Sequence, residues 1–168
     1  MDAGRRSGPL AQLMKLQLCA VGRLRSGPER DLVEDYLARF ERTGRPLGLP
    51  AVQLLELEDR KGGGMEAEAD LIAKAVAPGA ALVVLDERGR TLSSPEFADH
   101  LAHWRDSGRD VALAIGGADG LAPRLRDRAD LAISLGRMVW PHMLVRVMLA
   151  EQLYRAATIL AGSPYHRV

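Results

Sequence analysis

Apolar residues along the chain follow two spacing patterns, which alternate from segment to segment. Short, nearly continuous apolar runs are typical of strands buried on both faces, whereas apolar residues recurring every three to four positions are typical of amphipathic helices. The predicted strands span residues 15–21, 52–57, 80–85, 111–115 and 131–135. The predicted helices span residues 28–40, 65–76, 94–106, 122–129 and 144–160. Strands that alternate with helices predict an α/β fold: a single domain whose parallel sheet is covered by helices.

The beginning of the chain differs from the rest. Residues 1–13 are rich in Gly, Ser and Pro, carry Arg5 and Arg6, and lack the apolar core of a signal peptide. The first strand pattern starts at Met14. We therefore expect residues 1–13 to be a disordered extension, or to be absent from the natural protein if Met14 is its start. Residues 14–168 are expected to form the domain.

Composition excludes several classes of protein. With 47% hydrophobic and 27% charged residues, the chain is typical of a globular protein with a real core. Its longest apolar stretch, residues 144–160, is interrupted by Arg146, Glu151 and Arg155, so no membrane span is expected. Cys19 is the only cysteine, which excludes an internal disulfide and weakly favours the cytoplasm.

The charged residues and histidines give little evidence for nucleic-acid binding or for a metal site. The net charge is +1, and only three of the 23 basic residues are lysines. Arginine suits phosphate recognition, but a bias in genome composition explains the preference equally well. His100 and His103 lie three positions apart without a third ligand nearby, so they are interpreted as surface residues and no metal is expected.

Candidate chemistry is found where three predicted strands end. In open parallel sheets, ligands bind beyond the carboxyl ends of the strands. Gly116, Gly117 and Gly120 follow one such strand, but they match neither a dinucleotide fingerprint nor a P-loop. They allow either close approach of a ligand or simply a tight turn. Asp119 either caps the next helix or has a functional role.

The last predicted helix is apolar around most of its circumference. Such a helix is buried on more than one side, either at a subunit interface or in the centre of the core. Glu151 and Arg155 on this helix form a pair in the favourable i,i+4 order.

A series of segments, taken in order, is similar to a known family. The chain resembles the RlmH-type large-subunit rRNA pseudouridine N3-methyltransferases, which are minimal members of the SPOUT superfamily, from about Met14 to its C-terminus. The segments that carry the resemblance are Met14-Lys15-Leu16-Gln17-Leu18, Ala20-Val21-Gly22, Leu85-Asp86-x-x-Gly89, Trp104 with Gly108-Arg109-Asp110-Val111, Ile115-Gly116-Gly117-x-x-Gly120-Leu121, Pro141-His142-x-Leu144-Val145-Arg146-Val147, Glu151-Gln152-Leu153-Tyr154-Arg155-Ala156 and Pro164-Tyr165-His166-Arg167.

The resemblance implies a fold and a cofactor. Its C-terminal part would be threaded as a trefoil knot, which is otherwise rare in proteins. It implies a homodimer with an active site shared between subunits. S-adenosyl-L-methionine (SAM) would be held by the backbone of three loops. The residues implied are Leu85, Gly117, Leu135, Gly136, Arg137, Met138, Val139 and Trp140. Arg137 is expected to point outward, away from the cationic sulfonium, and Trp140 packs either on adenine or on the core.

The resemblance also implies a reaction: transfer of the SAM methyl group to N3 of a pseudouridine in large-subunit rRNA. The implied catalytic residues are Arg155, Tyr165 and His166, and the RNA-binding residues are Arg155, Tyr165 and Arg167. Taken alone, the last residues of a chain are equally expected to fray. The small net charge favours recognition of the assembled ribosome over naked RNA. The alternatives are another RNA target, a ribosome-binding module without activity, or a flavodoxin-like nucleotide binder.

Overall fold

The computed structural model describes residues 14–167, so the predicted N-terminal extension over residues 1–13 lies outside the described part. The strands are β1 Leu16–Val21, β2 Val52–Leu57, β3 Ala81–Thr91, β4 Val111–Ile115 and β5 Leu131–Ser134. The helices are α1 Pro28–Gly44, α2 Gly64–Ala75, α3 Ser94–Ser107, α4 Pro123–Arg128 and α5 His142–Ala161, with a 3-10 turn, η1, at Arg45–Leu47. The order of elements is the predicted one.

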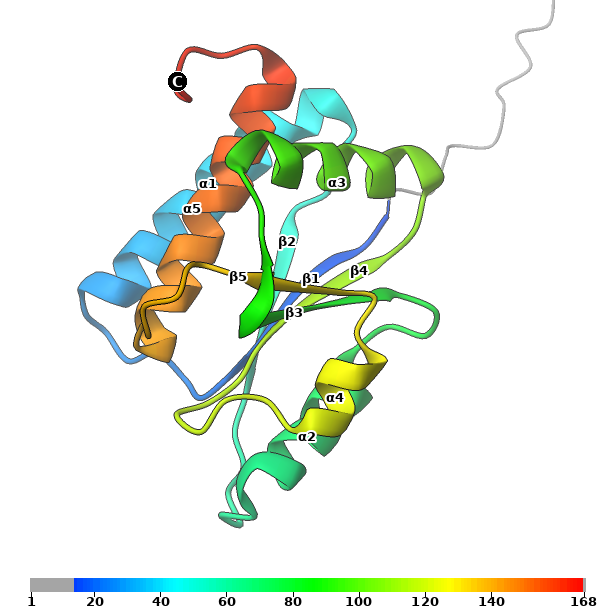
Figure 1. Cartoon of the computed structure of the whole chain (residues 1–168). Coiled ribbons are helices and arrows are strands. Elements are labelled where there is room, and N and C mark those ends of the chain that lie inside the picture. The colour runs from blue at the N-terminus through cyan, green and yellow to red at the C-terminus, as the bar shows by residue number, and fades with distance from the viewer. Residues whose placement is uncertain (1–13, 168) are drawn as a thin grey trace, which may run out of the picture.

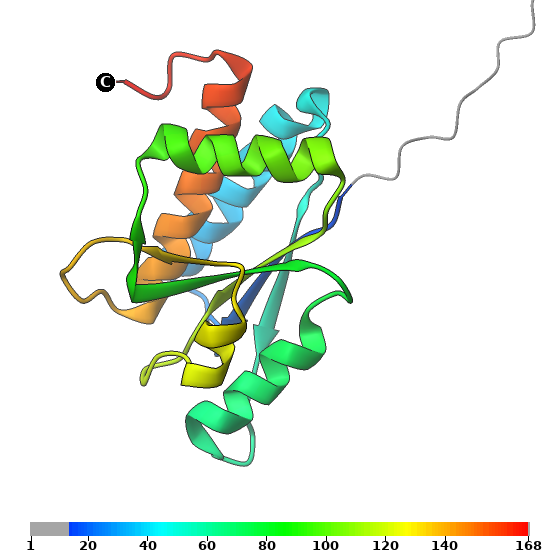
Figure 2. The same ribbon diagram turned by 45° about the vertical axis from the view of Figure 1, so that its right-hand side comes forward.

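The strands form one sheet in the order β2-β1-β4-β3-β5, and every neighbouring pair is parallel. Helices α1, α3 and α5 cover one face, and α2 and α4 cover the other (Figures 1 and 2). Alternate residues of the strands enter two separate cores: Leu113 packs with Phe40 on the first face, while Ala112 packs with Ile72 on the second. Burial on both faces explains why β4 and the first five residues of β3 are entirely apolar.

Strand β3 is longer than its sequence pattern predicts. The apolar run ends at Leu85, but the strand continues to Thr91. Leu85 and Arg90 both pair with Ile133 of β5, so residues 86–89 bulge out of the ladder between them. Gly89 closes this bulge, because a Cβ at that position would lie 2.6 Å from the carbonyl carbon of Ala132.

A buried arginine anchors the first turns of α5. Arg146 is 1% exposed, and its guanidinium lies 3.0 Å from a carboxylate oxygen of Glu56 at the end of β2. It also donates to the carbonyl oxygens of Val21 and Gly22, at 3.2 and 3.1 Å. The same Glu56 oxygen accepts the backbone N–H of Leu24. This cluster fixes α5 to the carboxyl ends of β1 and β2.

Two kinds of feature are absent from residues 14–167. No helix there is long and apolar enough to cross a membrane. No group of three or more His, Cys, Asp or Glu side chains in that range is arranged to hold a metal ion. His103 is exposed, whereas His100 is half-buried and stacks on Trp104 with 5.6 Å between ring centroids.

Candidate functional site

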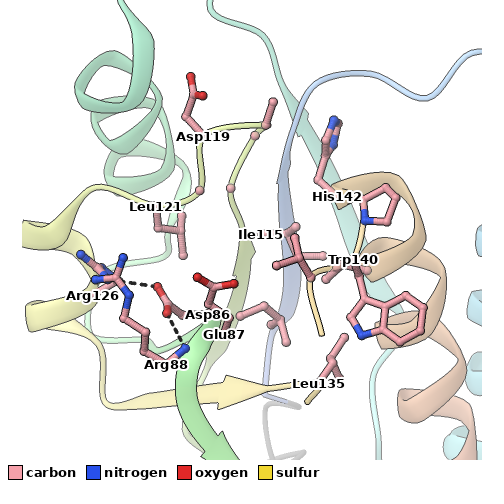
Figure 3. Close-up of a pocket in the computed structure, with 18 of the residues that line it drawn as sticks. Asp86, Glu87, Arg88, Ile115, Asp119, Leu121, Arg126, Leu135, Trp140 and His142 are labelled. Carbon is pink, nitrogen blue, oxygen red and sulfur yellow. Dashed lines mark hydrogen bonds and ion pairs between the residues drawn. The ribbon is translucent and has the colours of Figure 1, made fainter. Parts of the chain in front are cut away.

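A cavity of about 910 Å³ lies at the carboxyl ends of β3, β4 and β5 (Figure 3). Three loops line it: the bulge of β3, the glycine-rich turn after β4 and the segment that joins β5 to α5. The predicted cofactor residues that line the cavity are Leu85, Gly117, Leu135, Gly136, Met138, Val139 and Trp140. Arg137 is exposed and is not among the lining residues. The fold therefore brings all but one of these residues to one place.

The turn after β4 is tight enough to require glycine on its own account. A Cβ at Gly116 would lie 2.6 Å from the carbonyl carbon of Gly120, and Gly120 has a positive φ of 81°. The N–H of Gly120 donates to the carbonyl oxygen of Gly117 at 3.0 Å. Asp119 lines the cavity and is not the cap of α4, which begins after Ala122 without a side-chain cap. The capping alternative for Asp119 is therefore wrong.

The loop after β5 is held by hydrogen bonds between the side chain of Ser134 and the backbone of Gly136. The Oγ of Ser134 accepts the N–H of Gly136 at 3.1 Å and donates to its carbonyl oxygen at 2.9 Å. Gly136 has a φ of 117°, a conformation that L side chains rarely adopt. Beyond it, Met138 and Val139 are 75% and 80% exposed. Trp140 is 40% exposed at the cavity wall, which excludes the core-packing alternative within one chain.

One side of the cavity is charged. The carboxylate of Asp86 lies 3.5 Å from the guanidinium of Arg126 and accepts the backbone N–H of Arg88 at 2.8 Å (Figure 3). Both charged side chains are largely covered, at 11% and 20% exposed. Figure 3 shows this pair on the opposite side of the cavity from Trp140. Glu87 and Asp119 add two carboxylates to the lining.

A second polar cluster gathers around Glu151, which lies in the middle of α5. Its Oε1 accepts hydrogen bonds from Nε of Arg155 at 2.9 Å and from the hydroxyl of Tyr165 at 3.0 Å. The guanidinium of Arg155 also lies over the Tyr165 ring, 4.8 Å from its centroid, and its Nη1 is 3.2 Å from Nδ1 of His166. These contacts fold Tyr165 and His166 back onto α5, so they do not extend freely from it.

Protonation in this cluster follows from the geometry. Burial and the neighbouring carboxylate of Glu151 raise the pKa of Tyr165 to about 12, so its hydroxyl is a donor at neutral pH. A guanidinium only donates, so Nδ1 of His166 accepts from Arg155 and the neutral ring carries its proton on Nε2. That Nε2 is buried and has no partner within residues 14–167.

Sequence reasoning missed part of this cluster. Tyr154 packs against Tyr165 with centroids 4.6 Å apart and against Tyr36 of α1 at 6.3 Å, and the guanidinium of Arg39 lies 5.8 Å from both Tyr36 and Tyr154. A neighbouring cavity of about 560 Å³ between α1, α3 and α5 is lined by Glu151. The i,i+4 spacing on α5 indicated the pair with Arg155, but not that Glu151 is the centre of the cluster.

The two candidate regions lie at different levels of α5. His142, at the start of the helix, lines the large cavity, while Arg155 is 13 positions further along. At a rise of 1.5 Å per residue, that separation is about 20 Å. Arg167, in the tail, is exposed. One chain alone does not bring Tyr165 and His166 to the cavity.

Comparison with known proteins places the chain in a family. The family described as "Predicted SPOUT methyltransferase" matches residues 14–166. The chain belongs to the SPOUT methyltransferase family. It is 98% identical, over 155 residues, to a "Ribosomal RNA large subunit methyltransferase H" of Cereibacter sphaeroides, covering 92% of this chain and 100% of that protein. A protein of the same description from Paracoccus denitrificans is 70% identical over 92% of this chain and 99% of its own length. The family resemblance is thus confirmed.

A solved structure supports the fold of this SPOUT family member. It is described as a probable methylase family protein from Haemophilus influenzae Rd KW20, with a TM-score of 0.51 and 14% sequence identity. The alignment covers 94% of this chain and 72% of that one. The α/β class and the parallel, helix-covered sheet are therefore confirmed, and the knot stays a prediction.

Proposed function

We propose that this SPOUT family member is a SAM-dependent methyltransferase that methylates N3 of a pseudouridine in large-subunit rRNA, in the cytoplasm and on assembled ribosomes. The observation that carries the proposal is the cavity at the carboxyl ends of β3, β4 and β5, which collects residues that the family resemblance assigns to the cofactor. The names of the relatives support rRNA of the large subunit as substrate.

The cavity suits SAM in size and chemistry. At about 910 Å³ it lies within the range of small-molecule sites, which run from roughly 300 to 1,000 Å³. Glycine turns expose backbone N–H and C=O groups to it, and apolar Leu85 and Leu135 lie beside them. The carboxylates of Glu87 and Asp119 favour a cation. When bound, SAM would supply an activated methyl group, held by the backbone of Leu85, Gly117 and residues 135–140.

A homodimer with a shared active site follows from two features of the chain. The predicted catalytic side chains Arg155, Tyr165 and His166 are not among the residues that line the cavity, which supports their being provided by a second copy. An apolar surface beside the cavity supplies the contact. Its members, all 40% to 80% exposed, are Met138, Val139, Trp140, Met143 and Leu144. The proposal includes the trefoil knot, within a domain of residues 14–168.

The chain's own residues would bind and orient the RNA. In the reaction that this assignment implies, N3 of the base would give its proton to solvent water and take the methyl group that bound SAM would supply. The hydroxyl of Tyr165 already donates its one proton to Glu151, so its oxygen is assigned as an acceptor for an N–H of the base, and the Nε2–H of His166 is assigned to a carbonyl oxygen of the base and not to proton removal. Arg155 and Arg167 are assigned to phosphate. Positioning is then the larger contribution to catalysis, because the methyl group is already activated.

The test is mass mapping of rRNA from cells that lack this protein. We expect one pseudouridine of large-subunit rRNA to lose one methyl group and to regain it when the wild-type gene is restored. An unchanged rRNA mass map would refute the assignment. In vitro, purified ribosomes should be methylated faster than naked rRNA fragments. Equal rates would exclude recognition of the assembled particle, while absence of SAM binding in calorimetry would exclude any SAM-dependent activity.

A further inference from the structure

The charged side of the large cavity includes an arginine that keeps most of its hydrogen-bond donors unused. Arg126 of α4 lines the cavity, and its side chain is largely covered but still accessible. Its ion pair with Asp86 spans 3.5 Å, which is longer than a hydrogen bond, and its Nε has no hydrogen-bond partner among residues 14–167. A guanidinium carries five N–H donors, so this one has donors left for a ligand.

The chain holds both members of this ion pair in place before any ligand binds. Asp86 lies in the bulge of β3, where its Oδ1 accepts the backbone N–H of Arg88 at 2.8 Å and its Oδ2 contacts Arg126. Leu125, which precedes Arg126, is 2% exposed in the second core and fixes α4 against the sheet. Because these charged groups are already positioned, little entropy is lost in ordering them when a ligand binds.

Two neighbouring arginines differ from Arg126 in their surroundings. Arg124, on the same helix, lies outside the cavity lining and contacts Glu66 at 2.7 Å and Asp70 at 2.6 Å. Arg88 belongs to the lining but is exposed, so water and salt screen its charge. Of the two arginines in the lining, Arg126 is the better protected from water, where an ion pair with a ligand is stronger.

The two sides of the cavity match the two ends of SAM. SAM has an uncharged adenine at one end and a zwitterionic aminoacyl group, in which a carboxylate lies beside an ammonium, at the other. Figure 3 shows the Asp86–Arg126 pair across the cavity from Trp140. A preformed pair of opposite charges suits a zwitterion, because each charge of the ligand meets an opposite one, whereas an aromatic wall suits adenine.

We propose that Arg126 is a specificity-determining residue of the cofactor site, which binds the α-carboxylate of SAM while Asp86 faces its α-ammonium group. The inference rests on the proposed use of SAM. Arg126 gives the carboxylate the N–H donors that its ion pair leaves free, and Asp86 keeps the guanidinium in place. The cofactor is thereby oriented, with its aminoacyl end at the bulge of β3 and its adenine end toward Trp140. The backbone groups of the three loops then hold the rest of the molecule.

The experiment is a calorimetric comparison of two ligands on wild type and on Arg126→Met. The ligands are SAM and decarboxylated SAM, which keeps the sulfonium and the ammonium and lacks only the carboxylate. We expect wild type to bind SAM about thirtyfold more tightly than decarboxylated SAM, which is the effect of one charge-assisted contact. Arg126→Met should bind the two ligands with affinities within about threefold of each other, because the carboxylate then has no cation to contact.

Three further variants separate this contact from a general effect of charge or stability. Arg124→Met removes an arginine of the same helix that lies outside the lining, so it should keep the wild-type preference for SAM. Arg126→Lys keeps the charge but not the planar fork, so it should keep part of the preference. Asp86→Asn should weaken the binding of decarboxylated SAM, which carries the ammonium, and spare 5′-methylthioadenosine, which lacks both charged groups.

Equal affinity of wild type for SAM and decarboxylated SAM would overturn the inference, as would a preference that persists in Arg126→Met or that Arg124→Met also removes. Unchanged binding of decarboxylated SAM to Asp86→Asn would refute the role given to Asp86. All these results leave SAM binding, and with it the proposed function, intact. If wild type binds neither ligand, the proposed function fails and the inference fails with it. Should Arg126→Met fold poorly, wild type and Arg126→Lys with the two ligands still decide the question.

Discussion

Replacing Arg146 with methionine removes the charge that anchors α5 while keeping most of the volume of the side chain. The guanidinium of this 1% exposed residue contacts a carboxylate oxygen of Glu56 at 3.0 Å and two backbone carbonyl oxygens, of Val21 and Gly22, at 3.2 and 3.1 Å. All three contacts disappear in the variant. We therefore expect Arg146→Met to fold into the same structure with a clearly lower free energy of unfolding.

The size of the loss follows from what each partner retains. Two carbonyl groups lose a donor, at about 1 kcal/mol each. Breaking a buried ion pair costs roughly 3–5 kcal/mol when the remaining charge stays buried, but Glu56 is 27% exposed and still accepts the N–H of Leu24. Burial also lowers the pKa of Arg146, which shows that burying its charge costs free energy. Removing the charge removes this desolvation cost and so offsets part of the destabilisation. The net destabilisation should be about 3 kcal/mol, or roughly 9 °C in Tm for a chain of this size.

The assay is denaturant and thermal unfolding of Arg146→Met at one fixed protein concentration, because a dimer would make Tm depend on concentration. The matched control is Arg30→Met, which removes an exposed i,i+4 pair with Glu34 at 2.9 Å and should leave the free energy of unfolding close to that of wild type. The double variant Arg146→Met/Glu56→Gln should be less destabilised than the single one, since no carboxylate is left unpaired. A stability of Arg146→Met equal to that of the control would refute the reasoning.

Three further predictions concern the bulge, the tail and the apolar surface. Gly89→Ala should lower stability by about 1–3 kcal/mol in denaturant unfolding and weaken SAM binding, because its Cβ would meet the backbone of Ala132 at 2.6 Å; unchanged SAM affinity would count against the role of the bulge. Folding raises the pKa of Tyr165 from 10.0 to about 12. The stabilisation that its protonated hydroxyl provides is therefore full below pH 10 and is lost between pH 10 and about 12. In unfolding measured as a function of pH, Tyr165→Phe should not show this loss of stability at alkaline pH. Leu144→Glu should convert a dimer to a monomer in analytical ultracentrifugation, and a dimer of unchanged stability would argue against the apolar surface as the contact.

The sequence predicted the order of elements because apolar spacing reports burial directly. The predicted strand ends agree with the structure to within one residue for β1 and β4, where both faces are covered and each apolar run stops at a glycine. The pattern failed at β3, because residues 86–90 are mostly charged and read as a loop. Pairing with Ile133 of β5, a contact between segments far apart in the chain, keeps them in the strand, and no local pattern contains that information.

The candidate site was predictable to different extents in its two halves. Strand ends and glycines indicated the edge of the sheet where the cavity lies, and the family resemblance named its residues. The outward position of Arg137 was expected from its charge beside a cationic sulfonium, but spacing could not show that Asp119 lines the cavity, because that depends on the path of a turn.

The bulge in β3 also bears on how this wall of the cavity can change during evolution. Leu85 and Arg90 pair with the same residue of β5, so the four residues between them have no partner in the β3–β5 ladder and resemble an insertion. Substitutions, and even changes of length, within residues 86–88 would alter the cavity without shifting the register of any strand. Only Gly89, pressed against Ala132, is tied to the ladder. Ligand preference could therefore diversify here, at this one short segment, while the hydrophobic core stays as it is.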